Sequence, residues 1–442
     1  MKTLLERAKG SSLDVSIDQD VPVDTITLLS PLVQRVWRLE FERDYWKGIR
    51  KFSELNPGPL PLLRTLELSS YEPIDHIQPV MTTPPQSPLF TNAVNVKEFT
   101  FNSRRFQFLN HFIYPTLTTF TLWTAEVSRS RASDLFSFLR ASPMLRTVEI
   151  CTNTGIALDD IQQDMVVALP NVETFQLLGN SVNIYDVAAH ISCPSARDVS
   201  LIYQILDLDM LPGRELLPTS VPWDTIIHQY TRGVSVEEVA LELRPLYDHC
   251  SLTFRSTDTS AIRLGFELVP VSDEGNEPEI DFAEIDSEFY SQGFRVIQSH
   301  PLLPNAKRLH IRSGYPGFYV LEMEPFATEI GKVFGRLRSL DELTIGGRDM
   351  RPYHAAFDSL DDSGKLVAFP PIKHLTILRP WAEGAEEECA DAIVGMVKSQ
   401  HTRGQPFERV TIRADNLPVT MAERLRRWAN VVDCFVEGLP ED

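Results

Sequence analysis

A short pattern of apolar and polar positions recurs along the chain. It consists of an apolar residue, any two residues, a second apolar residue, any residue and a third apolar residue, as in Leu63-Arg64-Thr65-Leu66-Glu67-Leu68. The copies open at Val36, Leu63, Val96, Leu117, Leu145, Val172, Ala196, Ala306, Leu340, Ile372 and Phe407. Between Val36 and Ala196 the copies follow one another about every 27 residues, a typical length for a repeated structural unit. Because alternate residues of a strand face opposite ways, the last four positions of each copy predict a strand with one buried face.

Proline marks the entry to many of these predicted strands. It stands two residues before the first apolar position at Pro61, Pro115, Pro143, Pro170, Pro194, Pro304 and Pro370. Proline lacks an amide hydrogen and has a fixed φ, so it suits a strand entry and stops a preceding helix. The prolines therefore predict where each connection ends.

Apolar residues at three- and four-residue spacing precede several of the strands and predict helices. They form three groups: Leu135, Phe138 and Leu139; Ile161, Met165, Val166 and Leu169; Ile330, Val333, Phe334 and Leu337. A unit of helix, turn and strand cannot bury its own apolar face, so neighbouring units must stack. The sequence thus predicts an α/β fold, a leucine-rich-repeat solenoid (horseshoe) with a parallel inner sheet and outer helices. A doubly wound α/β domain is the alternative, although it requires no shared pattern in every strand.

We expect this solenoid to cover residues 1–434 in four parts. These are a first repeat block (1–200), degenerate repeats (201–300) with an acidic insertion (269–288), a second repeat block (301–416) and a C-terminal cap (417–442). The pattern is not found between Ala196 and Ala306, so a hinge between two solenoid segments remains the alternative to degenerate repeats.

Local signals predict the elements of the middle and the end of the chain. Ser235-Val236-Glu237-Glu238 resembles a capping box and predicts a helix to about Tyr247. Cys250 to Phe254 and the alternating stretch from Ile262 to Leu268 predict strands. At the C-terminus, the spacing of Met421, Leu425 and Trp428 predicts a helix, and Val431 to Val436 predict a last strand.

Composition favours a folded chain that binds neither membranes nor nucleic acids. No stretch approaches the ~20 continuous apolar residues of a membrane span, and the first residues lack a secretory apolar region. The formal charge is −19, with 61 acidic residues against 42 basic ones, which disfavours phosphate backbones. The five scattered cysteines indicate reduced thiols and hence a cytoplasmic or nuclear protein: Cys151, Cys193, Cys250, Cys389 and Cys434.

No motif in the sequence indicates catalysis, a cofactor or a metal. The phosphate-binding loop, nucleophile elbow, zinc-binding helix and dinucleotide patterns are all absent from the sequence. The acidic stretch from Asp273 to Glu288 lacks the spacing of a calcium loop, which favours a solvated loop. We therefore expect a binding protein, with an enzyme whose site is assembled from distant residues as an alternative.

Outward strand positions predict a partner-binding surface on the concave face of the sheet. In the first half these positions are acidic to neutral, whereas toward the C-terminus they become basic. The candidate partner-binding residues are Trp123, Arg308, His310, Arg312, His374, Arg409 and Arg413. Arginine binds carboxylate and phosphate groups, so a protein target with an acidic or phosphorylated segment would suit the basic end. The alternative is that these are ordinary solvated strand residues. His310 and His374 are expected to be exposed polar groups and not metal ligands, because no second ligand has local metal-site spacing.

The repeats also resemble a known protein family. The segments Leu60 to Leu68 and Leu139 to Ile150, together with Val221-Pro222-Trp223, are similar to those of fungal F-box proteins that carry leucine-rich repeats, and the resemblance covers essentially the whole chain. It implies that the repeats recruit a target, and that an N-terminal F-box binds the adaptor of a cullin-based ubiquitin ligase.

The start of the chain departs from the family pattern. Met1 to Lys9 form one helix-like segment, and a strand is predicted by Leu13, Val15 and Ile17, which leaves no room for a three-helix F-box. We therefore expect the substrate-recognition repeats of an F-box-type ubiquitin-ligase receptor that lacks a recognisable F-box. Adaptor binding is expected only if an F-box lies upstream. A free-standing repeat scaffold without a ligase link is the alternative.

Overall fold

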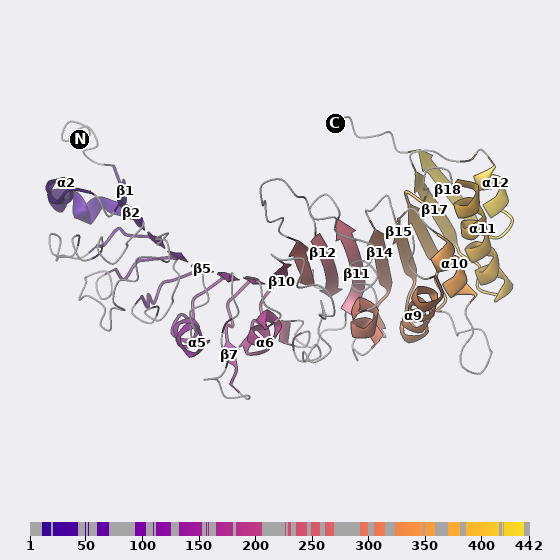
Figure 1. Ribbon diagram of the computed structural model, residues 1–442, viewed down its shortest axis with the longest axis horizontal. Coiled ribbons are helices and arrows are strands. Elements are labelled where there is room, and N and C mark those ends of the chain that lie inside the picture. Colours follow the sequence, from indigo (N-terminus) through magenta and orange to yellow (C-terminus); the bar gives the residue numbers. More distant parts are fainter. Residues whose placement is uncertain are drawn as a thin grey trace, which may run out of the picture. The chain divides into compact units, whose positions relative to one another are not determined.

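The computed structural model has an α/β repeat-type fold, in which most neighbouring strands pair in parallel (Figure 1). Apart from a few single residues, it describes residues 11–18, 21–42, 60–69, 93–102, 112–124, 132–152, 165–179, 183–205, 236–244, 249–256, 261–268, 292–298, 305–313, 323–347, 350–358, 370–380, 386–414 and 420–436. The chain divides into two compact units, Met1–Leu201 and Ile202–Asp442.

The strands of the first unit lie side by side in the order in which they occur along the chain. They are β1 (Leu13–Asp18), β2 (Val36–Glu42), β3 (Thr65–Ser69), β4 (Glu98–Asn102), β5 (Thr119–Thr124), β6 (Thr147–Thr152), β8 (Thr174–Gly179) and β10 (Asp198–Ile205), which begins in this unit. From β1 to β8 every pairing is parallel. The helical segments are α2 (Val23–Leu29), the 3-10 helix η1 (Ser30–Arg35), α5 (Ala132–Arg140) and α6 (Ile184–Ala189).

The second unit combines an antiparallel start with a parallel continuation. Its strand order is β13 (Ala261–Leu268), β12 (His249–Ser256), β11 (Val236–Arg244), β14 (Arg308–Ser313), β15 (Glu342–Gly346), β16 (His374–Leu378), β17 (Arg409–Ala414) and β18 (Val431–Val436). β11, β12 and β13 pair antiparallel, and all pairings from β11 through β14 to β18 are parallel. Its helices include α9 (Met323–Arg336), α10 (Arg351–Phe357), α11 (Glu386–Thr402) and the short α12 (Met421–Leu425).

One backbone hydrogen bond repeats from strand to strand. The residue after the first apolar position of each copy donates its N–H to the carbonyl of the equivalent residue in the preceding copy. Arg64 donates to Trp37, and Lys97 donates in turn to Arg64, both at 2.8 Å. In the second unit Lys307 donates to Glu237 and Asp341 to Lys307, also at 2.8 Å. This bond fixes the register at the point where each strand begins.

The prolines lie in tight turns immediately before the strands. In the turn from Leu60 to Leu63, the Leu63 N–H donates to the Leu60 carbonyl at 3.2 Å, with Pro61 in the second position. Proline favours that position because its φ already has the required value. An asparagine then links successive turns, since Asn95 Nδ2 donates to the Pro61 carbonyl at 2.9 Å. The prolines therefore shape the turns in addition to ending the preceding segments.

The apolar positions of the pattern form the core. Leu66 and Leu68 of β3 and Val410 and Ile412 of β17 are fully buried, as the alternation predicts. In the first unit, aromatic side chains fill the space under the strands, with the Phe120 ring 4.5 Å from that of Phe138 in α5. Figure 1 shows α9, α10 and α11 along one side of the strands of the second unit.

Helix packing in the second unit depends on aromatic side chains and a glycine. The Phe334 ring of α9 lies 5.6 Å from the Phe357 ring of α10. A Cβ at Gly395 of α11 would overlap the His354 ring of α10, so the glycine allows the close approach of these helices. Among the described residues, no helix is long and apolar enough to cross a membrane.

Several predicted elements are confirmed by the structure. Helices α5, α9 and α12 lie where the apolar spacing predicts them, although α12 ends at Leu425, before Trp428. Strands β1, β12, β13 and β18 also match their predicted segments. The acidic insertion, 269–288, and the helix-like segment Met1 to Lys9 lie outside the described residues.

The helix predicted before Pro170 is wrong over its described part. Val167–Ala168 form strand β7, which pairs with β9 (Ile191–Ser192) in parallel, and Ile161 lies outside the described residues. The Val167 N–H donates to the His190 carbonyl at 2.8 Å, and His190 Nδ1 is 2.7 Å from the Met165 carbonyl. These long-range hydrogen bonds override the helical spacing of the apolar residues.

The helix predicted from Ser235 to Tyr247 is also wrong over its described part, because Val236–Arg244 form strand β11, while Ser235 and residues 245–247 lie outside the described residues. Two adjacent glutamates, Glu237 and Glu238, interrupt the alternation of apolar and polar residues and imitate helical spacing. The structure accommodates them in an irregularity of register between Val236 and Glu238. Beyond it, Val239 and Leu241 are buried and Glu242 lies on the other face. Val236 also opens a further copy of the pattern.

The C-terminal end of α11 is closed by Gly404. The Gly404 N–H donates to the His401 carbonyl at 2.9 Å and the Gln405 N–H to the Gln400 carbonyl at 3.2 Å, which is the Schellman arrangement. Gly404 has φ of 78°, and a Cβ added at this position would meet no heavy atom within 4 Å. Only the backbone conformation therefore favours glycine here.

We expect Gly404→Ala to lower the free energy of unfolding by about 1 kcal/mol, because an L-residue with a side chain is disfavoured at positive φ. Denaturant unfolding followed by circular dichroism measures this change. Gly404→Asn is the matched control, since asparagine tolerates this region better and should lose less stability than alanine. Equal stability of the alanine variant and the unmodified chain would contradict this account of the helix end.

Candidate functional site

The polar side of the second unit's sheet gathers most of the predicted partner-binding residues. We call the following residues the polar face of the second unit: Glu238, Glu242, Arg308, His310, Arg312, Glu342, Thr344, His374, Thr376, Arg409, Thr411, Arg413, Asp433 and Phe435. They alternate with the buried apolar residues along each strand. Their order on the sheet follows directly from the parallel register.

The register arranges these side chains in three rows across the strands. The first row runs through Glu238, Arg308, Glu342, His374 and Arg409, and the second through His310, Thr344, Thr376, Thr411 and Asp433. The third row includes Glu242, Arg312, Arg413 and Phe435. The structure therefore brings together Arg308, His310, Arg312, His374, Arg409 and Arg413.

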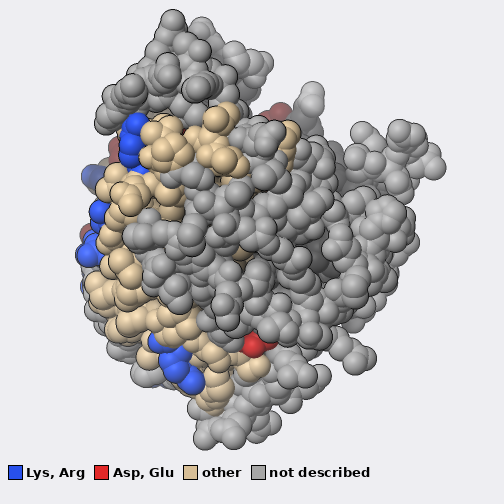
Figure 2. Space-filling model, turned by 90° about the vertical axis from the view of Figure 1, so that its left-hand side faces the viewer, with Lys and Arg blue, Asp and Glu red and all other residues tan. Residues whose placement is uncertain are grey.

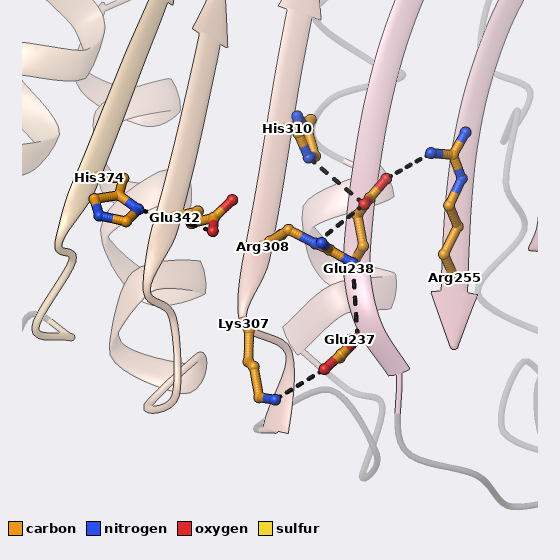
Figure 3. Close-up of polar contacts among 8 residues, drawn as sticks. All are labelled: Glu237, Glu238, Arg255, Lys307, Arg308, His310, Glu342 and His374. Carbon is orange, nitrogen blue, oxygen red and sulfur yellow. Dashed lines mark hydrogen bonds and ion pairs between the residues drawn. The ribbon is translucent and has the colours of Figure 1, made fainter. Parts of the chain in front are cut away.

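Glu238 is the centre of a charged cluster in the first row (Figure 3). Its carboxylate lies 2.9 Å from Arg255 Nη1 of β12 and 3.2 Å from Arg308 Nε of β14, the strands on either side of β11. The Glu238 side chain is only 11% exposed. This nearly buried carboxylate is shared between two guanidinium groups and links three strands.

Glu237 extends this cluster along the strand entry. Its carboxylate accepts a hydrogen bond from Lys307 Nζ at 2.8 Å, and its other oxygen lies 3.7 Å from Arg308 Nη2. The hydrogen bond to Lys307 lowers the pKa of Glu237, and the same bond raises the pKa of Lys307. Lys307 and Arg308 thus both pair with carboxylates of β11.

The remaining cations of the polar face also have partners. Arg312 lies 3.6 Å from Glu242, and Arg409 Nε lies 3.5 Å from Asp433. His374 Nδ1 lies 3.8 Å from Glu342. The Arg413 guanidinium lies 5.8 Å from the centre of the Phe435 ring, a cation–π contact. The face is therefore a mixed pattern of paired charges and not the uniformly basic surface that the cations alone suggest.

Sequence reasoning missed the acidic half of this face. The local pattern places Glu238 and Glu242 on a predicted helix, which hides their positions beside Arg308 and Arg312. A signal was present, because Val236, Val239 and Leu241 match the repeated pattern. Had the copy that opens at Val236 been recognised, Glu238 would have been aligned with Arg308 in the neighbouring strand.

His310 lies inside the face, between the two rows of arginines. Its ring is largely buried, which corrects the exposed position that the sequence predicts, and neither ring nitrogen has a hydrogen-bond partner among the described residues. Burial lowers the pKa of His310, and Arg312 and Arg308 act in the same direction, while Glu238 and Glu242 oppose them. Nε2 lies 3.9 Å from Glu238, beyond hydrogen-bond distance. His310 is therefore neutral at neutral pH.

The corresponding face of the first unit is richer in acidic residues. Arg38 of β2 pairs with Glu67 at 2.8 Å and with Glu40 at 3.8 Å. Burial raises the pKa of Glu40, and the nearby carboxylates of Glu67 and Glu42 raise it further. In the view of Figure 2, Lys and Arg side chains stand at separate points, and much of the described surface is uncharged.

Trp123, the remaining predicted partner-binding residue, lies on the first unit. It belongs to β5, with Asn102 and Cys151 as its neighbours in register, and it is 44% exposed. A half-exposed tryptophan on a strand offers a large apolar surface with a hydrogen-bond donor. It belongs to a different unit from the charged rows described above.

The described residues contain no group of three or more His, Cys, Asp or Glu side chains that could hold a metal ion. Cys151, Cys193 and Cys389 are buried and Cys434 is half-buried, all as free thiols. Burial raises the pKa of Cys193 and Cys434, so neither is activated as a thiolate. The described surface is marked instead by its paired charges and by exposed aromatic residues such as Trp123 and Phe435.

Comparison with known proteins adds little to this description. No protein-family model matches the chain, and no curated protein matches it. Solved structures that match include the leucine-rich repeat-containing protein LegL7 from Legionella pneumophila, at 10% identity over 78% of this chain and 85% of that chain, with a TM-score of 0.32. At this TM-score the two backbones agree only loosely, and the fold described above rests on its own strands and hydrogen bonds.

We expect Glu238→Gln to destabilise the second unit by about 1–2 kcal/mol, because it removes the charge that compensates Arg255 and Arg308 while both guanidinium groups stay half exposed. Glu342→Gln is the matched control, since Glu342 lies in the same row but is more exposed, and its contact with His374 is longer, at 3.8 Å. Urea unfolding of both variants tests this. An equal effect of the two substitutions would contradict the central role of Glu238.

The lowered pKa of His310 predicts a pH dependence of stability. Below the pKa of an unfolded histidine, about 6.5, the unfolded chain binds a proton that the folded chain does not. The stability that neutral His310 contributes to the fold is therefore fully present above about pH 6.5. It is lost as the pH falls from there through the folded-state pKa. We expect His310→Gln to reduce the loss of stability between neutral and mildly acidic pH, as measured by thermal unfolding. Parallel pH profiles for both proteins would contradict this.

Proposed function

We propose that the chain is a protein-recognition scaffold of the leucine-rich-repeat type, which binds a protein partner on the polar face of the second unit. The observation that carries this proposal is the unbroken register from β11 through β14 to β17, which displays polar side chains in rows. Helices occupy the other side of these strands (Figure 1). Stacked units of this kind form extended binding surfaces in repeat proteins.

The proposed partner presents an acidic or phosphorylated segment to Arg312, Arg409 and Arg413. A guanidinium carries five N–H donors, so pairing with one carboxylate leaves donors for another. Arg409 retains 59% of its side-chain exposure beside Asp433, and Arg312 retains 45% beside Glu242. The carboxylates of Glu242 and Asp433 and the ring of Phe435 hold these guanidinium groups in place, which reduces the entropy lost on binding.

Paired charges also favour a specific partner over a general polyanion. A surface on which every cation has a nearby acid or aromatic ring attracts long phosphate chains weakly, because few counterions are released. A folded partner with complementary charges can instead match the alternation of Glu238, Arg308 and Glu342 along the first row. Protein binding is accordingly proposed in preference to catalysis.

A narrower proposal follows from the family resemblance. If the chain functions as the target-recognition part of an F-box-type ubiquitin-ligase receptor, then the chain extended by any F-box encoded upstream should co-purify with the ligase adaptor. A free-standing repeat scaffold should capture a target without that adaptor. Affinity purification followed by mass spectrometry distinguishes the two forms of the proposal.

The central test of partner binding is a charge reversal on the polar face. We expect the combined variant Arg308→Glu, Arg312→Glu, Arg409→Glu and Arg413→Glu to capture the natural partner at least ~10-fold less well, since each reversal exchanges a donor for an acceptor. Quantitative mass spectrometry of the captured proteins gives the ratio. Circular dichroism of each variant must first show a retained fold.

The matched control carries reversals on the helices. Lys332→Glu and Arg351→Glu also each break one ion pair, with Glu329 at 2.8 Å and Glu388 at 3.1 Å, but lie in α9 and α10. This control should capture the partner as well as the unmodified chain does. Undiminished capture by a folded polar-face variant would refute the proposed binding surface.

A further inference from the structure

The two outermost strands of the described sheets differ in how they protect their free edges. β1 carries Asp14 and Asp18, and Ser16 Oγ donates to Glu42 at 2.7 Å. Charged residues on an edge strand oppose pairing with another chain. β18 has the sequence Val-Val-Asp-Cys-Phe-Val, in which Asp433 is the only charged residue. The edge of β18 therefore lacks the protection that β1 has.

Apolar side chains are exposed on both sides of β18. Val431 and Phe435 lie on the polar face, with exposures of 41% and 51%, and Val436 on the other side is 67% exposed. Val432 and Cys434 are half-buried, although the equivalent residues of β17 are completely buried. The apolar core thus continues to the end of the sheet without being fully covered there.

The main-chain groups of β18 identify the residues that an added strand would contact. The Val431 N–H donates toward β17, to the Glu408 carbonyl at 3.1 Å. Main-chain groups of a parallel strand alternate in direction, so those of Asp433 and Phe435 also face β17. The N–H and C=O groups of Val432, Cys434 and Val436 therefore face the free edge.

We propose that β18 pairs antiparallel with β18 of a second copy of this chain, with Cys434 opposite the partner's Cys434 and Val432 opposite the partner's Val436. This register uses all of the outward main-chain groups of the three residues. It also covers Val432, Cys434 and Val436 with their own counterparts, which extends the apolar core across the edge.

Charge selects this register over its nearest alternative. A shift that centres the pair on Asp433 would place two aspartates directly opposite each other, which is unfavourable. In the proposed register Asp433 lies opposite the partner's Phe435, whose ring is in contact with the Arg413 guanidinium of its own chain. Each aspartate therefore approaches an arginine of the other copy, and the twofold symmetry repeats this pair.

Symmetry favours β18 of a second copy over β1 of a second copy. Antiparallel pairing of identical edges forms a closed dimer, whereas pairing of β18 with β1 would be head-to-tail and leave an edge free for further chains. β1 would also bring Asp14 and Asp18 to the apolar edge without cations of its own strand to compensate them. The apolar, self-complementary edge fits a twofold dimer.

The first experiment measures the mass in solution. Light scattering after size exclusion, on the 442-residue chain from about 1 to 100 µM, should show a concentration-dependent approach to twice the 50.1 kDa of one chain. Phe435→Lys and Val436→Lys should each weaken the dimer by at least ~30-fold, because a lysine at the apolar seam must be desolvated. Both side chains are exposed in the single chain, so its fold should be retained.

Met144→Lys is the matched control, because Met144 is 49% exposed but lies in the turn before β6. It should dimerise like the unmodified chain. A chain that stays monomeric throughout the concentration range would overturn the proposal. This holds even if the monomer binds an extended peptide at β18. A dimer unaffected by Phe435→Lys and Val436→Lys would overturn it as well.

The second experiment tests the register. In a hydrogen-bonded antiparallel pair the opposite Cα atoms are about 5.5 Å apart, a distance that a disulfide can span. Diamide, which takes up two electrons and two protons as two thiols form one disulfide, should link the dimer through Cys434. Because burial raises the pKa of Cys434, the reaction is run at about pH 8.5. Cys434→Ser should abolish the link but keep the dimer. If the unmodified chain forms a dimer that diamide does not link through Cys434, the register is wrong.

Discussion

The structure depends on one repeated backbone hydrogen bond at the start of each strand. The N–H of the second residue in a copy reaches the carbonyl of its counterpart in the preceding copy, for example from Lys373 to Asp341 and from Glu408 to Lys373, both at 2.8 Å. Because this bond is made at the same position every time, the strands cannot slip by one residue. A one-residue slip would move every buried side chain to the polar face. The register therefore determines both the core and the functional surface.

Much of the fold follows from the apolar pattern. Strands that contain a complete copy of the repeated pattern, such as β3 and β17, were predicted correctly. Their local alternation of apolar and polar residues is enough to identify the buried side. Helices α5 and α9 were predicted for the same reason. The errors occurred where a contact distant in sequence decides the structure. Val167 joins a strand near Ile191, and Val236 enters a strand despite two consecutive glutamates.

The candidate site was predictable only in part. The outward positions of β14, β16 and β17 identified Arg308, His374 and Arg409, since alternation alone places them on the polar face. Their electrostatic partners were not predictable. Glu238 comes from a strand 70 residues away from Arg308, and its side chain is held by two neighbouring strands. Charge on a sheet face depends on which strands become neighbours, and that is a property of the topology.

The central claim is that the repeated hydrogen bond aligns the strands of the second unit and that β11 is one of them. Residue-resolved hydrogen–deuterium exchange tests it most directly, through the amides of Lys307, Asp341, Lys373 and Glu408. These amides should exchange as slowly as those in the buried centres of the strands, because each donates to the neighbouring strand. Rapid exchange at these four positions, within strands that are otherwise protected, would contradict the account.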